Sequence, residues 1–286
     1  MTRLCTLARP CAALLLLALP SVASCQAAGG APASDRTASP RVIRVVSRNY
    51  SFAAPAQAEG GRVTVRLVNE GTEPHYLRLM RLAPGKTLAD FVAWRGSGTP
   101  APEWMSGAGG PAPVMPGDST EQTTVLQAGT YVILCSYPTE QGVPHVQMGM
   151  FGSMQVTASG EADAALPAAD GRLTLADYAY GLEDGLRAGT RTIEVENRGR
   201  EPHQVLLIRL PPGVAPEAEV AWFRGGSRGP RPGHPHGGIL EVLPGETTRF
   251  TTTLEPGEYM LLCGIRAPDG RRHFEHGMVK TLTVRG

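Results

Sequence analysis

One heptapeptide occurs twice in the chain, and this repetition decides the fold. Residues 69–75 have the sequence Asn-Glu-Gly-Thr-Glu-Pro-His, and residues 197–203 have the sequence Asn-Arg-Gly-Arg-Glu-Pro-His, so that the two closing histidines lie 128 positions apart. The same offset separates further identical pairs: Tyr50 and Tyr178, Trp94 and Trp222, Pro116 and Pro244, Gly129 and Gly257, and Tyr131 and Tyr259. Two copies of one unit therefore follow each other along the chain.

Each copy consists mainly of short segments in which apolar and polar side chains alternate, a pattern typical of β-strands. The expected strands are 62–68, 76–82, 130–137 and 153–157 in the first copy and 191–196, 204–210, 258–265 and 279–284 in the second. One short helix per copy is expected, at 87–94 and at 216–223, with Trp94 and Trp222 packing it onto the strands. The sequence predicts an all-β protein of two tandem, antiparallel Greek-key β-sandwich domains.

Composition places the domain boundaries. Residues 158–170, rich in Ala, Gly, Asp and Pro, interrupt the strand pattern and predict a linker between a first domain at 41–157 and a second at 171–286. Residues 26–40 contain little besides Ala, Gly, Pro and Ser, which predicts a flexible tether.

The first 25 residues have the features of an export signal. Arg3 and Arg9 precede an apolar run that is too short to span a bilayer, and small residues stand just before Cys25. This ending resembles the lipobox of bacterial lipoproteins, which implies cleavage before Cys25 and lipidation of its thiol. The expected location is extracytoplasmic, with the protein anchored to a bacterial membrane by this lipid, or secreted if ordinary signal cleavage occurs instead.

The near balance of basic and acidic residues argues against one class of partner. The chain has 27 basic and 26 acidic residues. Without an excess of positive charge there is no electrostatic attraction to a polyanion, so a nucleic-acid partner is not expected.

Four residues per copy carry the chemistry. In chain order they are a histidine, a cysteine, a second histidine ten positions after the cysteine and a methionine five positions further on. Two imidazoles, a thiolate and a weak thioether are the donors of a blue-copper site, in which soft sulfur favours Cu(I) and imidazole accepts both oxidation states. These candidate residues are His75, Cys135, His145 and Met150 in the first copy and His203, Cys263, His273 and Met278 in the second.

Over nearly all of the chain after Arg41, the sequence resembles the cupredoxin (blue, type 1 copper, plastocyanin-like) superfamily in two tandem copies. The resemblance rests on Asn-x-Gly-x-x-Pro-His, on Gly-x-Tyr-x-x-x-Cys at 129–135 and 257–263, and on Cys-loop-His-x-x-x-x-Met. It implies a cupredoxin-like fold and one copper per copy, held by the four residues named above. His145 and His273 are the expected electron exits.

Some features depart from the pattern or leave alternatives open. The residue after the first histidine, often Asn in blue copper proteins, is Tyr76 or Gln204, and the loop from cysteine to histidine is longer than in plastocyanin-like carriers. Met148 and His276 are alternatives for the axial position. Both copies are also compatible with domains that have lost the metal, whereas a disulfide between Cys135 and Cys263 is not expected because equivalent sites of two sandwiches lie far apart.

Two-domain cupredoxin chains also resemble nitrite reductases and small laccases, so enzyme activity has to be considered. The His next to the Cys, which feeds a catalytic cluster in those families, is replaced by Leu134 and Leu262, and the whole chain has seven histidines. Only His234 and His236 form a His-x-His motif, which we expect in a Gly/Pro/Arg-rich loop, and an accessory copper site there is the less favoured interpretation. The sequence therefore predicts a redox carrier or copper-binding protein and not an enzyme.

The function predicted from the sequence is that of an extracytoplasmic copper protein that transfers single electrons to or from a redox partner protein. Two alternatives stay open at this stage. One is a lipoprotein for copper trafficking or tolerance without electron transfer, and the other is a metal-free cupredoxin-like interaction module.

Overall fold

The structure of the protein is a computed structural model that describes residues 39–159, 164–183 and 185–286. The expected signal segment with Cys25, most of the tether and part of the expected linker lie outside the described residues. All the described residues belong to one compact unit. Within it, the first repeat is defined as residues 41–157 and the second repeat as residues 171–286. Their division into two separate domains stays a prediction.

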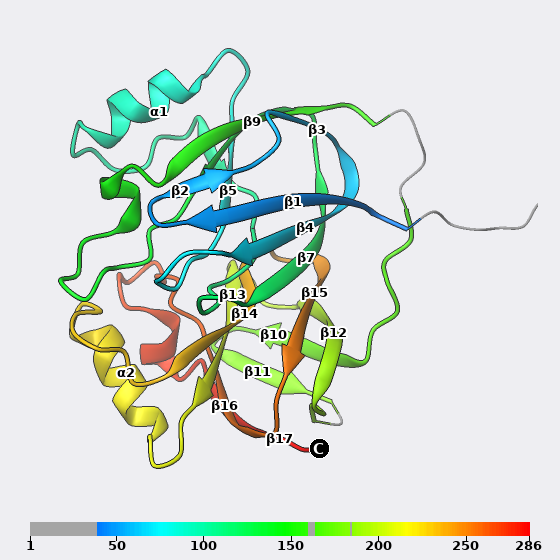
Figure 1. Ribbon diagram of the computed structural model, residues 1–286, viewed down its shortest axis with the longest axis vertical. Helices are drawn as coiled ribbons and strands as arrows, with labels where there is room; N and C mark the ends of the chain where they lie inside the picture. Colours follow the sequence, from blue (N-terminus) through cyan, green and yellow to red (C-terminus); the bar gives the residue numbers. More distant parts are fainter. Residues whose placement is uncertain (1–38, 160–163, 184) are drawn as a thin grey trace, which may run out of the picture. The chain divides into compact units, whose positions relative to one another are not determined.

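A mixed sheet of eight strands passes through both repeats, in the order β11-β10-β12-β15-β7-β4-β1-β2 (Figure 1). The repeats meet where β7 pairs antiparallel with β15, which places Phe250 opposite Gln122. The strands of this sheet are β1 (Arg41–Arg48), β2 (Ser51–Ala53), β4 (Gly61–Asn69), β7 (Ser119–Leu126), β10 (Gly171–Ala176), β11 (Ala179–Leu182), β12 (Gly189–Asn197) and β15 (Thr247–Leu254).

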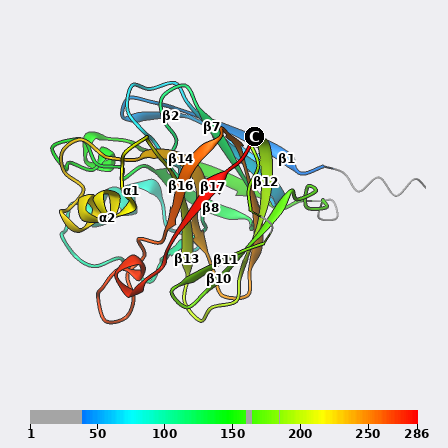
Figure 2. The same ribbon diagram turned by 90° about the horizontal axis from the view of Figure 1, so that it is seen from below.

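Each repeat adds a smaller sheet of its own. In the first repeat the order is β3-β9-β8-β5-β6, and in the second it is β14-β13-β16-β17, whose last strands are seen side by side in Figure 2. These strands are β3 (Gln57–Glu59), β5 (Arg78–Leu82), β6 (Met105–Gly107), β8 (Gly129–Leu134), β9 (Phe151–Thr157), β13 (His203–Leu210), β14 (His234–Val242), β16 (Gly257–Leu262) and β17 (Val279–Val284).

Each repeat has an apolar core formed by the buried side chains of its strands. In β4, Val63, Val65 and Leu67 are buried while Arg66 between them is exposed. They pack against Tyr131 of β8, on the smaller sheet, in one apolar cluster, and Ile193 and Tyr259 occupy the matching places in the second repeat. Each core therefore lies between one half of the eight-stranded sheet and one smaller sheet, as in a β-sandwich.

Three strand pairs differ from the antiparallel arrangement that the sequence predicted. β1 and β4, β10 and β12, and β3 and β9 run parallel. Between β1 and β4 the chain passes through β2 and then β3, which belongs to the other sheet, and this crossover returns it in the same direction. Alternation has the same period in both orientations, so the pattern predicts strands but not their direction.

The expected helices are present as α1 (Leu88–Arg95) and α2 (Pro216–Arg224). The Thr87 side chain accepts a hydrogen bond from the backbone N–H of Asp90, and the Asp90 carboxylate accepts one from the Thr87 N–H, a capping box that fixes where α1 begins. Phe91 anchors α1 on β8 through contacts with Val132 and Leu134. Short 3₁₀ helices η1 (His145–Met148) and η2 (His273–His276) follow the loops after β8 and β16.

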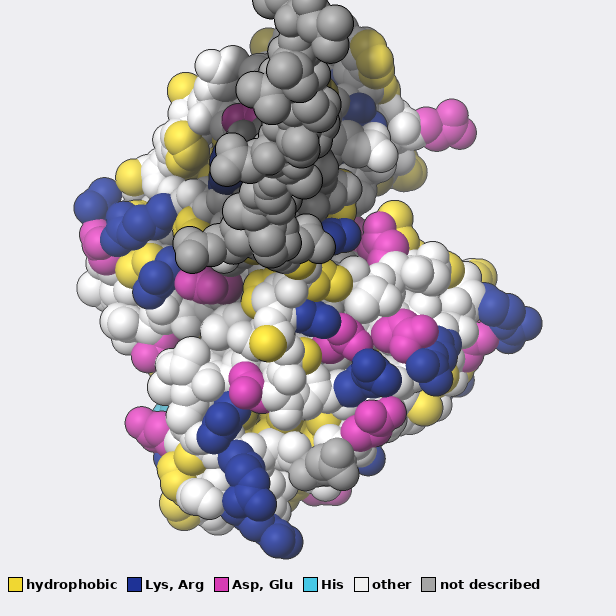
Figure 3. All heavy atoms as spheres, turned by 90° about the vertical axis from the view of Figure 1, so that its right-hand side faces the viewer, with side chains coloured by type: hydrophobic (Ala, Val, Ile, Leu, Met, Phe, Trp, Pro, Cys, Tyr) yellow, Lys and Arg dark blue, Asp and Glu magenta, His cyan; other side chains and the backbone are white. Residues whose placement is uncertain are grey.

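Charges are mixed on the surface. The face in Figure 3 carries interspersed basic and acidic side chains. Strands β10 and β12 are linked by an ion pair between Arg172 and Glu194, with 3.0 Å between Nε and Oε1. Within the part of the chain that the structure describes, no helix is long and apolar enough to cross a membrane.

Candidate metal centres

The fold brings the first histidine, the cysteine and the second histidine of each repeat together. In the first repeat, His75 follows the turn after β4 and is held in a β-bridge with Val114, Cys135 comes directly after β8, and His145 begins η1. In the second repeat, His203 begins β13, Cys263 comes directly after β16, and His273 begins η2. All six side chains are fully buried.

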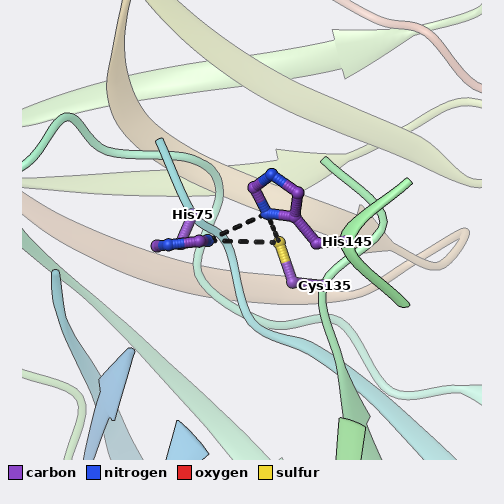
Figure 4. Close-up of side chains that lie close together, drawn as sticks. All are labelled: His75, Cys135 and His145. Carbon is purple, nitrogen blue, oxygen red and sulfur yellow. Dashed lines mark hydrogen bonds between the residues drawn. The ribbon is translucent and has the colours of Figure 1, made fainter. Parts of the chain in front are cut away.

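In the first site the donor atoms form a small triangle (Figure 4). The Nδ1 atoms of His75 and His145 lie 3.0 Å apart, and the Sγ of Cys135 lies 4.0 Å from the former and 3.7 Å from the latter. A metal ion with nitrogen and sulfur ligands at about 2.0–2.3 Å needs donors that are separated by such distances. Two imidazoles and a soft sulfur are donors that suit copper.

The second site repeats this geometry. The Nδ1 atoms of His203 and His273 lie 3.0 Å apart, and the Sγ of Cys263 lies 3.4 Å from Nδ1 of His273. All the donor atoms of either group lie within 4.8 Å of one another. The protein therefore has two buried His-Cys-His groups that can bind copper.

The two predicted axial methionines lie beside the cysteines. Met150 belongs to the same buried cluster as Cys135, and its carbonyl oxygen accepts a hydrogen bond of 3.1 Å from the Cys135 N–H. Met278 shares a buried cluster with Cys263 and accepts the corresponding bond at 3.2 Å. Both side chains are fully buried, whereas the alternative Met148 is half exposed.

A carboxylate faces the outer nitrogen of the second histidine in each site. Nε2 of His145 lies 2.8 Å from Oε2 of Glu73, and Nε2 of His273 lies 2.9 Å from Oε2 of Glu201. A negative charge beside Nε2 favours the tautomer that carries the proton on Nε2, which leaves Nδ1 free for a metal. The sequence analysis missed both glutamates, although their identity at matching positions of the repeated heptapeptide was a usable signal.

The sulfur atoms receive backbone support. The N–H of Tyr76 points to Sγ of Cys135 at 3.5 Å, and the N–H of Gln204 points to Sγ of Cys263 at 3.4 Å. The side chains at these positions depart from the family pattern, but the backbone donor does not depend on the side chain.

Burial sets the protonation of the donors. It raises the pKa of the Cys135 and Cys263 thiols to about 12, so that both are neutral near pH 7. It lowers the pKa of His75 and His203 to about 4, helped by the charge of the neighbouring imidazole, so that these rings are unprotonated near pH 7. Since a thiolate is the metal ligand, binding a cation here releases a proton from the sulfur.

The remaining histidines are not part of either group. The sequence placed His234 and His236 in a loop, but they begin strand β14, where Nε2 of His236 lies 2.6 Å from the Thr253 carbonyl oxygen. His276 lies 3.1 Å from Asp269 and stacks on Tyr178 with 4.5 Å between the ring centroids. The expected electron exits, His145 and His273, are fully buried.

Comparison with known proteins gives structural matches only. No family model matches the chain, and no curated protein matches it. Among solved structures, the auracyanin of Roseiflexus castenholzii is 23% identical, covers 42% of this chain and 99% of its own, and has a TM-score of 0.29. A blue copper oxidase from Nitrosomonas europaea is 14% identical, covers 86% of each chain and has a TM-score of 0.25. A copper nitrite reductase from the same organism is 13% identical, covers 85% of this chain and 93% of its own, and has a TM-score of 0.25.

The predicted all-β fold, with one short α-helix in each repeat, is confirmed. The prediction that the protein is not an enzyme is wrong in what it excludes. The solved structures that align with 85–86% of the chain include multicopper oxidases and copper nitrite reductases, which are enzymes. The histidine count and the leucines before the cysteines test for particular copper clusters, and they do not exclude enzyme activity in general.

Proposed function

We propose that each His-Cys-His group holds one copper ion as a type 1 site and that the protein transfers single electrons through these sites. The observation that carries the proposal is the buried triangle of two Nδ1 atoms and one Sγ, present in both repeats with all donor atoms of a group within 4.8 Å of one another. Copper bound there supplies a one-electron couple.

The surrounding residues suit a site that changes charge with little movement. Glu73 and Glu201 place a negative charge within 2.9 Å of the outer nitrogens of the second histidines, and backbone N–H groups point to both sulfurs. Ligands that are already held in place need little rearrangement when the charge of the ion changes. Met150 and Met278 are proposed as weak axial ligands, because they share the buried clusters of the two cysteines.

The proposal extends to organisation and location. The two repeats are proposed to be tandem cupredoxin domains at 41–157 and 171–286, and residues 1–25 are proposed to be a lipoprotein signal. Lipidation of Cys25 would attach the protein to the extracytoplasmic face of a bacterial membrane, with residues 26–40 as the tether. A redox partner protein would exchange electrons with the sites.

A copper titration tests the proposal. Cu(II) is added to the reduced full chain in detergent, and the visible spectrum and the bound copper per chain are measured. We expect an intense thiolate-to-copper band, halved in Cys135→Ser or Cys263→Ser, absent in the double variant and unchanged in the control Cys25→Ser.

The results separate the alternatives. Absence of the band in a chain whose circular dichroism shows normal folding contradicts the proposal. Tight binding of Cu(I) without reversible oxidation contradicts the electron-transfer part and favours copper trafficking.

A further inference from the structure

The ligand loop of the first site, residues 135–145, is in contact with the other repeat. The segment after α2, residues 225–233, reaches this loop at two points. The Gly229 N–H donates a hydrogen bond of 2.8 Å to the Glu140 carbonyl oxygen, and Nη1 of Arg231 donates one of 3.0 Å to the Tyr137 hydroxyl. The second repeat therefore supports the loop that carries Cys135 and His145.

Arg231 is itself firmly anchored on α2. Its Nε lies 2.6 Å from Oε1 of Glu219, a fully buried carboxylate whose Oε2 accepts the Gly233 N–H at 2.8 Å. The guanidinium also lies over the rings of Trp222 and Phe223, at 4.9 and 5.1 Å from their centroids. An arginine fixed by a buried carboxylate and two rings presents its remaining N–H groups in a defined direction.

Tyr137 connects this arginine to the metal site. Its buried side chain shares a cluster with Cys135 and Met150, and its ring centroid lies 5.9 Å from that of His145. Its carbonyl oxygen accepts the His145 N–H at 2.9 Å, which closes the loop. A shift of Tyr137 therefore moves groups that touch both ends of the ligand loop.

The second site has no matching contact among the described residues. The residue that corresponds to Tyr137 is Ile265, whose carbonyl oxygen accepts the His273 N–H at 2.8 Å but whose side chain has no hydroxyl group. At the positions that correspond to Glu219 and Arg231, the first repeat has Phe91 and Glu103. The same ion pair therefore cannot form in the reverse direction.

The ligand loop of the second site, residues 263–273, is braced from within instead. Nη1 of Arg272 donates a hydrogen bond of 2.8 Å to the Gly264 carbonyl oxygen, and Nη1 of Arg266 donates one of 2.7 Å to the Gly270 carbonyl oxygen. The two sites thus have the same three donor types and different supports.

We propose that Arg231 of the second repeat is a positioning residue for the first metal site, which it holds through Tyr137, and that the second site does not depend on it. The proposal rests on the proposed function only in assigning the positioned group to a metal. A cavity of about 390 Å³ adjoins the contact, and Glu73, Tyr137, Trp222 and Arg231 are among the residues that line it. A shorter side chain at position 231 would therefore leave open space beside Tyr137.

Thiol reactivity tests the proposal without any metal. The metal-free full chain is alkylated, and modification of Cys135 and of Cys263 is followed separately by peptide mass spectrometry. In Arg231→Lys, which loses the planar guanidinium that contacts Glu219 and Tyr137 through different nitrogens, we expect alkylation of Cys135 to become about tenfold faster, the size expected for a lost charged hydrogen bond, while Cys263 stays unchanged. Tyr137→Phe removes only the hydroxyl group and is expected to act in the same direction.

Arg272→Lys is the matched control for the second site, where it should speed alkylation of Cys263 and leave Cys135 unchanged. Equal acceleration of both cysteines in Arg231→Lys would indicate general loosening and would overturn the proposal. Unchanged reactivity of Cys135 in both Arg231→Lys and Tyr137→Phe would overturn it as well.

Copper spectra supply a second readout. With Cys263→Ser isolating the first site and Cys135→Ser isolating the second, Arg231→Lys is expected to shift the copper band of the first site only. A shift confined to the second site would contradict the proposal. If neither parent shows a copper band, the proposed function fails, whereas the alkylation result still decides the role of Arg231.

Discussion

At the scale of single residues, steric crowding explains why the third residue of the repeated heptapeptide is glycine in both copies. A Cβ added to Gly71 would lie 2.8 Å from Nε2 of His75, and one added to Gly199 would lie 2.7 Å from Nε2 of His203. Carbon atoms do not approach ring nitrogens this closely without a shift. The turn can pass the ring of this histidine only if this position lacks a side chain.

Gly71→Ala is therefore expected to displace His75 and to weaken copper binding at the first site by about 10- to 100-fold, the range seen when groups that orient metal ligands are disturbed. Competition with a copper chelator in the Cys263→Ser background measures this affinity. Gly96→Ala is the control, since its added Cβ would have its nearest neighbour at 3.6 Å. Parent-like affinity in Gly71→Ala would show that the glycine is not needed for ligand placement.

The buried donors also predict how the stability of the metal-free chain depends on pH. The pKa of His75 and His203 is lowered from 6.5 to about 4, so the unfolded chain binds more protons between these values and stability falls as pH drops from 6.5 to 4. The pKa of both thiols is raised from 9.0 to about 12, so stability also falls as pH rises from 9 to 12.

Thermal unfolding of the chelator-treated chain should accordingly show its highest Tm between about pH 6.5 and 9. The double variant Cys135→Ser/Cys263→Ser is the control, because it lacks both thiols and should lose less stability on the alkaline side. Equal alkaline losses in the two chains would contradict the assigned cause.

At the scale of elements, the sequence predicts what local patterns encode. The strands expected at 62–68 and 279–284 appear as β4 and β17, because alternation selects one buried face. Helix α1 spans Leu88–Arg95 and so begins one residue after the expected 87–94, because Thr87 is the N-cap of a capping box with Asp90. The two His-Cys-His groups could be predicted because a metal site needs particular residue types, and these types recur at the same offset in both repeats.

Other elements could not be predicted in this way. The Gly and Pro residues around His234 and His236 are typical of loops, but both histidines lie in β14. Pairing with β13 outweighs the low strand propensity of this segment. The hydrogen bond between Arg231 and Tyr137 was also not predictable, because the two residues lie 94 positions apart in the chain. Contacts between segments that are distant in the chain depend on the tertiary fold, and local sequence patterns do not show which segments come together.

At the scale of the whole molecule, the junction of β7 and β15 makes one sheet from the two repeats. Gln122 is buried at this junction, where its Oε1 accepts the Gly110 N–H at 2.7 Å and its Nε2 lies 3.4 Å from the Thr248 hydroxyl oxygen. The Thr248 hydroxyl donates in turn to the Thr123 carbonyl oxygen at 2.7 Å. Separating the repeats would break the two hydrogen bonds that Thr248 makes to the first repeat and would expose the buried side chains of the junction to water.

This continuity predicts that the repeats unfold together. In Cys263→Ser only the first site is expected to bind copper, and at a free copper concentration 100 times its Kd the ion would stabilise the folded chain by about 2.7 kcal/mol. Calorimetry should then show a single transition that moves to higher temperature as a whole, with a ratio of calorimetric to van't Hoff enthalpy of about one. The double cysteine variant should show no shift with copper. If the second repeat unfolded in a separate transition at its copper-free temperature, the shared sheet would not couple the repeats, because a ligand of one independent domain stabilises that domain alone.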